Sequence, residues 1–128
     1  MAVVFGVGTD IIEIVRIARI IERHGELFLN RVFTPAEVDF CQRRKKTYEH
    51  FAGRWAAKEA VAKALGTGFV RGIHFRDIEV CSAPNGRPSI KLHGGTRDYA
   101  EQCGIGDVLI SISHCRSYAT ATAIALKK

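Results

Sequence analysis

An alanine-rich stretch in the middle of the chain, WAAKEAVAKALG at residues 55–66, constrains the fold more than any other segment. Alanine, leucine, lysine and glutamate favour helix, and glycine commonly follows a helix end, so we expect a helix over about residues 49–66. At about 100° per residue, one of its faces carries only small residues, which are Gly53, Ala57, Ala60 and Ala64. A face this small predicts that another backbone lies directly against the helix.

A different face of the same helix carries Glu59 and Lys63, at positions i and i+4 and beside alanines. One interpretation is an ordinary surface ion pair, which stabilises a helix by about 0.3–0.5 kcal/mol. The other is a phosphate site, in which a lysine supplies a point charge and a carboxylate holds Mg²⁺. Spacing alone leaves both interpretations open.

The N-terminal region predicts a strand followed by a basic helix. The apolar run AVVFGVG at residues 2–8, punctuated by glycine, is typical of a buried strand. Asp10 and Glu13 then have the D-x-x-E spacing of a helix cap, and the helix would end near Gly25. Isoleucines fall on one side of this helix and arginines, including Arg16, on the other. Asp10 is therefore an N-cap, a metal ligand or both, because a carboxylate has two oxygens.

The rest of the chain predicts an α+β fold. TPAE at residues 34–37 has the pattern of a capping box with proline at the first helical position. Further on we expect two strands around the turn Asn85-Gly86, a short helix, and two strands around a turn at residues 114–116. The first two strands are expected at residues 73–80 and 88–93, the helix at residues 96–103, and the last two strands on either side of residues 114–116. This order predicts a mainly antiparallel sheet packed against the long helix, in a single domain of residues 1–128.

Composition excludes several classes of protein. The chain is 47% hydrophobic and 25% charged, which is typical of a folded globular protein. Its net charge of +6 indicates an acidic partner, whether phosphate, nucleic acid or protein. No apolar run approaches the roughly 20 residues of a membrane span, and four scattered cysteines form no zinc or disulfide pattern. We therefore expect a cytoplasmic protein with reduced thiols.

Two other features are ambiguous taken alone. GVGTD at residues 6–10 resembles part of a dinucleotide fingerprint, but Ile11 occupies the position of its third glycine. His114 follows the strand-like SIS and has either a structural role or a role in phosphate contact or proton transfer. The basic run at residues 43–46 has no nucleic-acid recognition motif around it, so we interpret it as a solvated loop.

Four segments taken together resemble one family. GVGTDI at 6–11, WAAKEAVAKALGTG at 55–68, NGRP at 85–88 and SISH at 111–114 resemble, in this order, the bacterial holo-acyl-carrier-protein synthases. These enzymes are 4′-phosphopantetheinyl transferases. Their central pattern, aromatic-x-x-K-E-A-x-x-K-A-x-G, is matched at every fixed position, although Trp55 stands where phenylalanine is usual. The resemblance spans nearly the whole chain.

That resemblance implies a Mg²⁺-dependent enzyme of fatty acid biosynthesis. It would move 4′-phosphopantetheine from coenzyme A to a serine of acyl carrier protein and release adenosine 3′,5′-bisphosphate. The base that takes the serine proton is either Glu59 or a magnesium-bound hydroxide. Family members are typically homotrimers with active sites at subunit interfaces, and we expect neither nucleic acid nor a membrane as a partner.

The resemblance also assigns residues. Asp10 and Glu59 would hold Mg²⁺, Lys63 would contact the phosphates of coenzyme A, and these three would be catalytic together with His114. The other coenzyme A contacts would be Arg54, Gly66, Asn85, Gly86, Arg87, Pro88 and His114. The carrier protein would contact Arg16, Phe28 and Arg31. The competing hypothesis, a basic module that binds RNA or an acidic protein, leaves Glu59 and SISH unexplained.

Overall fold

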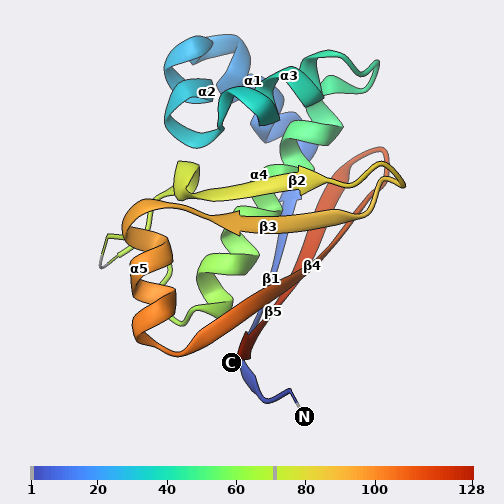
Figure 1. Ribbon diagram of the computed structural model, residues 1–128. Helices are drawn as coiled ribbons and strands as arrows, with labels where there is room; N and C mark the ends of the chain where they lie inside the picture. The colour runs from blue at the N-terminus through green and yellow to red at the C-terminus, as the bar shows by residue number, and fades with distance from the viewer. Residues whose placement is uncertain (1, 71) are drawn as a thin grey trace.

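The computed structural model describes residues 2–70 and 72–128, and Figure 1 shows how their helices and strands are arranged. Every strand pair is antiparallel, in one sheet of order β1-β5-β4 and a separate β2-β3 hairpin. The predicted α+β class and order of elements are confirmed, with the strands divided between two sheets. In chain order the elements are β1 (Val4–Glu13), α1 (Ile14–His24), α2 (Glu26–Val32), α3 (Pro35–Gln42), α4 (Thr47–Ala64), the 3₁₀ turn η1 (Phe75–Asp77), β2 (Ile78–Ser82), β3 (Pro88–Leu92), α5 (Gly94–Gln102), β4 (Ile105–His114) and β5 (Tyr118–Lys127).

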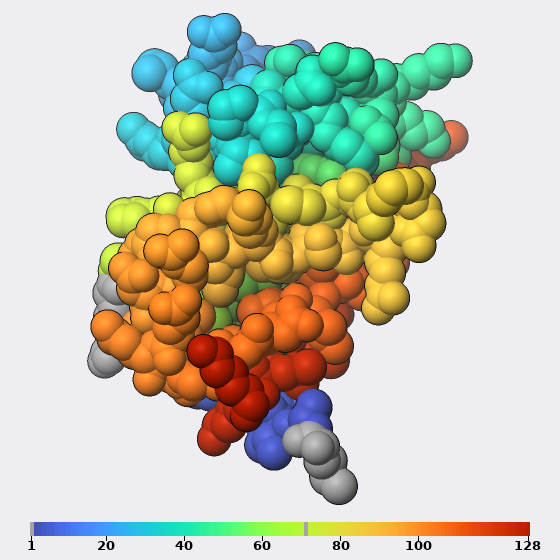
Figure 2. Space-filling view, viewed as in Figure 1, coloured from blue at the N-terminus to red at the C-terminus, as the bar shows by residue number. Residues whose placement is uncertain are grey.

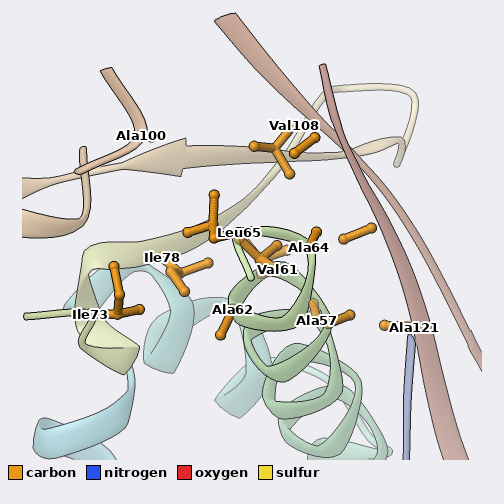
Figure 3. Close-up of a cluster of buried hydrophobic side chains, with 14 of the residues drawn as sticks. Ala57, Val61, Ala62, Ala64, Leu65, Ile73, Ile78, Ala100, Val108 and Ala121 are labelled. Carbon is orange, nitrogen blue, oxygen red and sulfur yellow. The ribbon is translucent and has the colours of Figure 1, made fainter. Parts of the chain in front are cut away.

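Helix α4 lies directly against the three-stranded sheet because both surfaces carry small residues. Gly8 of β1 lies against the carbonyl of Ala60, and Gly6 against the carbonyl of Ala64, so a Cβ on either glycine would overlap the helix backbone. The central strand β5 contributes four alanines that are at most 1% exposed, namely Ala119, Ala121, Ala123 and Ala125. Figure 3 shows the larger side chains of this core on another side of α4. The backbone predicted to approach the small face is therefore β1.

Helices α1, α2 and α3 gather at one end of the molecule, as the light blue and teal atoms at the top of Figure 2 show. Ile17 of α1 and Val32 of α2 are almost fully buried there, with Phe51 from the first half of α4. The apolar face of α1 is thus confirmed, while Arg16 is exposed on its other side. This end of the molecule presents basic helical surface to solvent.

The predicted helix start at Asp10 is wrong. Strand β1 continues to Glu13, where it still pairs with Tyr118 of β5, and α1 begins at Ile14 without a side-chain cap. The ladder with β5 supplies hydrogen bonds that the local D-x-x-E spacing does not reveal. Because side chains alternate along a strand, Asp10 projects from the same face as Gly8, toward α4.

Other boundaries agree in part with the sequence. Thr34 and Glu37 form the predicted capping box, and the loop around Gly86, whose φ is +84°, joins β2 to β3. The predicted strand over 73–80 begins only at Ile78, after the 3₁₀ turn, and α2 was not predicted at all. Within residues 2–70 and 72–128, no helix is long and apolar enough to cross a membrane.

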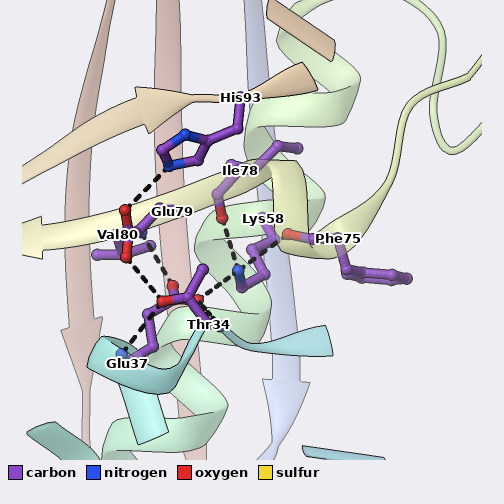
Figure 4. Close-up of polar contacts among 8 residues, drawn as sticks. All are labelled: Thr34, Glu37, Lys58, Phe75, Ile78, Glu79, Val80 and His93. Carbon is purple, nitrogen blue, oxygen red and sulfur yellow. Dashed lines mark hydrogen bonds and ion pairs between the residues drawn. The ribbon is translucent and has the colours of Figure 1, made fainter. Parts of the chain in front are cut away.

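Lys58, to which the sequence assigned no role, is fully buried and joins three elements (Figure 4). Its Nζ donates to Glu37 Oε1 at 2.8 Å and to the carbonyls of Phe75 at 2.9 Å and Ile78 at 2.6 Å. The other oxygen of Glu37 accepts from the backbone N–H of Val80 at 2.9 Å. Burial lowers the pKa of Lys58, and Glu37 opposes that shift. The pair fixes α3 and β2 against α4.

Candidate functional site

Asp10, Glu59 and Lys63 come together where β1 runs along α4. Lys63 Nζ lies 3.3 Å from Asp10 Oδ1 and donates to the carbonyl of Thr9 at 2.9 Å. The hydroxyl of Thr120 donates to the backbone carbonyl of Asp10 at 2.9 Å. In the described part of the chain, the ion pair of Lys63 is therefore with Asp10 on the strand and not with Glu59 on its own helix. The interpretation as an ordinary i, i+4 surface pair is not supported.

Electrostatics in this group favour a bound cation. Partial burial raises the pKa of Glu59, the negative charge of Asp10 raises it further, and Lys63 lowers it. A cation between two carboxylates reduces the repulsion between their negative charges. We find no group of three or more His, Cys, Asp or Glu side chains placed to hold a metal among residues 2–70 and 72–128. Asp10 and Glu59 could together hold Mg²⁺, which takes one or two protein carboxylates and completes its shell with water or substrate phosphate.

Gly66 belongs to this same group. It lies just past the end of α4, with a φ of +83°, and its N–H donates to the carbonyl of Lys63 at 3.0 Å. Glycine can end a helix in the left-handed backbone conformation because it has no Cβ to clash there. Its exposed backbone therefore follows directly after the end of the helix that carries Lys63.

Arg54 occupies another side of α4, about 140° around the helix from Glu59. Its residue is 5% exposed, its Nη2 donates to Ser82 Oγ at 3.2 Å, and its guanidinium carbon lies 3.8 Å from the centre of the Phe40 ring. Burial lowers the pKa of Arg54, and its Nε has no hydrogen-bond partner among the described residues. Arg54 thus holds α4 to the loop end of the β2-β3 hairpin, at the last residue of β2.

The hairpin loop presents the remaining predicted nucleotide contacts. Asn85, Gly86 and Arg87 are exposed, and Asn85 Oδ1 accepts from the N–H of Arg87 at 3.0 Å. The predicted turn is confirmed. Pro88, with Arg87, lines a hollow of about 240 Å³ between the hairpin and β4. The loop therefore lies on the β4 side of the sheet.

His114 lies at the end of β4, the edge strand opposite β1. Its Nδ1 is 3.1 Å from Glu49 Oε2, and its ring centroid is 5.6 Å from that of His50. The pKa of His50 is lowered by burial first and then by the charges of Arg54 and His114, among others. His114 therefore lies on the same side of the molecule as Arg54.

The predicted site residues thus fall into two groups within one chain. Asp10, Glu59, Lys63 and Gly66 lie along the β1 edge. Arg54, Asn85, Gly86, Arg87, Pro88 and His114 lie on the hairpin and β4 side. Strand β5 separates the two edge strands of the sheet.

The predicted carrier contacts lie on the helical end. Phe28 and Arg31 line a hollow of about 190 Å³ together with His24 and Leu27. Leu27 is 78% exposed, whereas Phe28 also packs on Trp55 with ring centroids 5.9 Å apart. An exposed apolar side chain next to basic ones can dock an acidic amphipathic segment.

Comparison with known proteins identifies the family. The model of the 4′-phosphopantetheinyl transferase superfamily matches residues 6–123. The chain belongs to this superfamily. It is 52% identical over 120 residues to a holo-[acyl-carrier-protein] synthase of Chlamydia felis, an alignment covering 94% of this chain and 95% of that one. The resemblance inferred from the four motifs is confirmed.

Solved structures of the superfamily share the fold. The crystal structure of holo-[acyl-carrier-protein] synthase from Neisseria meningitidis has a TM-score of 0.89 and 33% identity, covering 96% of this chain and 98% of that chain. The Helicobacter pylori holo-[acyl-carrier-protein] synthase, solved in complex with coenzyme A, has a TM-score of 0.83 and 31% identity. That match covers 93% of this chain and 98% of the other. The predicted fold class is that of the superfamily.

Proposed function

We propose that this chain transfers 4′-phosphopantetheine from coenzyme A to a serine of acyl carrier protein, leaving adenosine 3′,5′-bisphosphate. Membership of the superfamily and the coenzyme A complex of the Helicobacter pylori relative support this activity. The observation that carries it in this chain is the meeting of Asp10, Glu59 and Lys63, which suits a diphosphate. The enzyme would act in the cytoplasm, in fatty acid biosynthesis, through one domain of residues 1–128.

Charge is the main obstacle to this reaction, because the serine hydroxyl must attack a phosphorus surrounded by negative oxygens. Lys63 offsets part of that charge, and its hydrogen bond to the Thr9 carbonyl holds it in place before substrate arrives. Asp10 and Glu59 would hold Mg²⁺, which when bound supplies further neutralisation of the diphosphate. Glu59 and Lys63 lie on a face with small neighbours, so a diphosphate could lie close to the helix.

The nucleotide half of coenzyme A would bind Arg54, Gly66, the 85–88 loop and His114. The loop and His114 lie at the β4 edge of the sheet, whereas Asp10 lies at the β1 edge. We therefore propose a homotrimer in which one copy supplies the metal-binding residues and its neighbour supplies the hairpin. The outer face of the three-stranded sheet supports assembly, because it exposes large apolar side chains. These are Val7 at 59%, Ile11 at 64%, Leu109 at 43% and Tyr118 at 46%.

The acidic carrier protein would dock on α1 and α2, at Arg16, Phe28 and Arg31. The charge of +6 favours such a partner, and charge pairs at an interface are weakened by salt. Arg16→Glu should therefore raise KM for the carrier about tenfold and leave KM for coenzyme A unchanged. If added salt and this substitution both leave the carrier KM unchanged, the basic surface has another role.

A single assay tests the activity. Apo carrier protein, coenzyme A and Mg²⁺ are mixed with the enzyme, and mass spectrometry follows the phosphopantetheine adduct on the carrier. Asp10→Asn and Glu59→Gln should each abolish the adduct with the circular dichroism spectrum intact, whereas Asp39→Asn, at an acid whose side chain is 61% exposed on α3, should not. Absence of adduct with either Mg²⁺ or Mn²⁺ would instead favour a basic binding module.

A further inference from the structure

The first turn of α4 carries a carboxylate that none of the roles above uses. Glu49 Oε2 lies 3.1 Å from His114 Nδ1, and the two side chains are 17% and 33% exposed. A negative charge in the first turn of a helix is favoured by the helix dipole. Glu49 is therefore a stable, partly shielded carboxylate held against the ring of His114.

This contact determines which ring nitrogen carries a hydrogen toward Glu49. An oxygen of an ionised carboxylate 3.1 Å from Nδ1 repels a lone pair on that nitrogen and attracts an N–H, so Nδ1 carries the hydrogen whether the ring is neutral or protonated. Nε2 is then the ring nitrogen available to a ligand, to which it donates when the ring is protonated and from which it accepts when the ring is neutral. The edge-to-face contact with His50, whose ring plane is inclined at 69°, restricts rotation of the His114 ring.

Basic side chains act on His50, whose ring packs on that of His114. The groups that act on His50, next to His114, are the positive Arg54 and Arg44 and the negative Glu49. Arg54 also reaches the hairpin at Ser82. Basic side chains beside an exposed loop suit the phosphate-bearing nucleotide half of coenzyme A.

We propose that Glu49 is a positioning residue: it keeps a proton on Nδ1 of His114 and so directs Nε2 toward the nucleotide half of coenzyme A. Glu49 acts through His114 and does not touch the substrate. The ligand named here rests on the proposed function. The assignment of the proton to Nδ1 does not rest on the proposed function, because it follows from the Glu49 contact alone.

The tautomer can be observed directly. Long-range ¹H–¹⁵N NMR of the uniformly labelled protein, with His114 assigned by loss of its signals in His114→Asn, shows which nitrogen is protonated. We expect Nδ1–H in the wild type and in Glu49→Gln, since the glutamine oxygen still accepts, and a shift to Nε2–H in Glu49→Ala. A wild-type ring protonated on Nε2 alone overturns the proposal without recourse to any variant.

Kinetics test the effect on substrate. Glu49→Ala should raise KM for coenzyme A about tenfold, since the carboxylate contact that orients the ring is lost. In a His114→Ala background the same change should raise KM less than about twofold, because the residue through which Glu49 acts is absent. Equal effects in both backgrounds would show that Glu49 acts by another route.

The chain offers a matched control in a second glutamate–histidine pair. Glu79 Oε1 lies 3.0 Å from His93 Nε2, away from the hairpin loop and β4. Glu79→Ala should lower the melting temperature yet leave KM for coenzyme A within about twofold, because it orients no ligand-binding ring. A rise equal to that of Glu49→Ala would attribute both effects to stability and refute a positioning role.

Failure of this inference is distinguishable from failure of the proposed function. If the wild type transfers phosphopantetheine but the NMR spectrum shows the same protonated nitrogen on His114 in Glu49→Ala, the proposed activity is supported and the inference is refuted. If the wild type transfers nothing, adenosine 3′,5′-bisphosphate is titrated into the labelled protein. A shift of the His114 Nε2 signal that weakens in Glu49→Ala supports the inference, and an unmoved signal refutes it.

Discussion

Three charged residues of α4 have different roles because the helix turns about 100° from one residue to the next. Lys58 points into the protein and is fully buried, whereas the side chain of Lys63 is 51% exposed. Glu59, adjacent to Lys58 in sequence, faces Asp10 and is only partly buried. A single rotation along the helix thus separates a structural ion pair from the proposed phosphate site.

Glu59 should reduce stability at neutral pH. Its pKa is raised in the folded state, by burial first and then by Asp10, so the folded protein holds this proton more tightly than the unfolded chain does. The favourable contribution of Glu59 to the free energy of unfolding is therefore fully present below the pKa of Glu59 in the unfolded chain. It is lost as pH rises through the pKa of Glu59 in the folded protein. We expect Glu59→Gln to melt a few degrees higher than the wild type at pH 7.5, with the difference vanishing near pH 4. Thermal melts at the two pH values check this, and a lower melting temperature for Glu59→Gln at pH 7.5 would contradict it.

At the scale of elements, the contact between β1 and α4 places Asp10 near Glu59. A Cβ on Gly8 would overlap the Ala60 carbonyl and lie only 2.7 Å from the backbone nitrogen of Ala64. Gly8→Ala must therefore separate strand from helix, which should lower the free energy of unfolding by about 1–3 kcal/mol and reduce turnover. Urea denaturation and the adduct assay measure the two effects.

Gly95 provides the control for that substitution. It lies inside α5, has no positive φ, and its Cβ would meet its nearest neighbour at 3.4 Å, an ordinary contact. Gly95→Ala should leave turnover unchanged and raise the free energy of unfolding by up to about 1 kcal/mol. If Gly8→Ala behaved in the same way, the close approach of β1 would not matter for the site.

The Lys58–Glu37 pair should be the costliest polar contact to break. Lys58→Met would leave Glu37 buried without its cation, and losing one partner of a buried pair typically costs about 3–5 kcal/mol. Arg43→Ala, at an exposed pair with Asp39, should cost less than about 1 kcal/mol. Chemical denaturation of both variants compares them, and similar losses would mean that burial adds nothing to the Lys58 pair.

The elements could be predicted where their signal is local. The capping box of α3, the small face of α4 and the turn at Gly86 each depend on residues close in sequence, and the structure contains all three. The length of β1 depends instead on pairing with β5 at the far end of the chain, and a local cap pattern at Asp10 concealed it. The short α2 is stabilised by packing of Leu29 and Val32 in the core, for which its seven residues give little periodic signal.

At the scale of the whole molecule, the candidate site depends on contacts that no spacing reveals. Lys63 and Asp10 meet because β1 and α4 pack together, and only the family resemblance linked them beforehand. The resemblance also named Arg54 and His114, but their place on the other side of the sheet follows from the strand order β1-β5-β4. Glu49 and Lys58 could not be assigned from sequence, since each has a partner distant along the chain.

Assembly should depend on the outer face of the sheet. Val7, Ile124 and Leu109 form one row across β1, β5 and β4, on the face away from α4. Leu109→Asp would place a charge in the middle of a buried apolar contact if copies meet there, and burying an unpaired charge is strongly unfavourable. We therefore expect a trimeric mass by light scattering for the wild type, a monomeric mass for Leu109→Asp, and loss of turnover in that variant because the hairpin of a neighbour is absent. Leu27→Asp, at a more exposed leucine on α2, should stay trimeric. A monomeric wild type that still transfers phosphopantetheine would show that one chain completes the site.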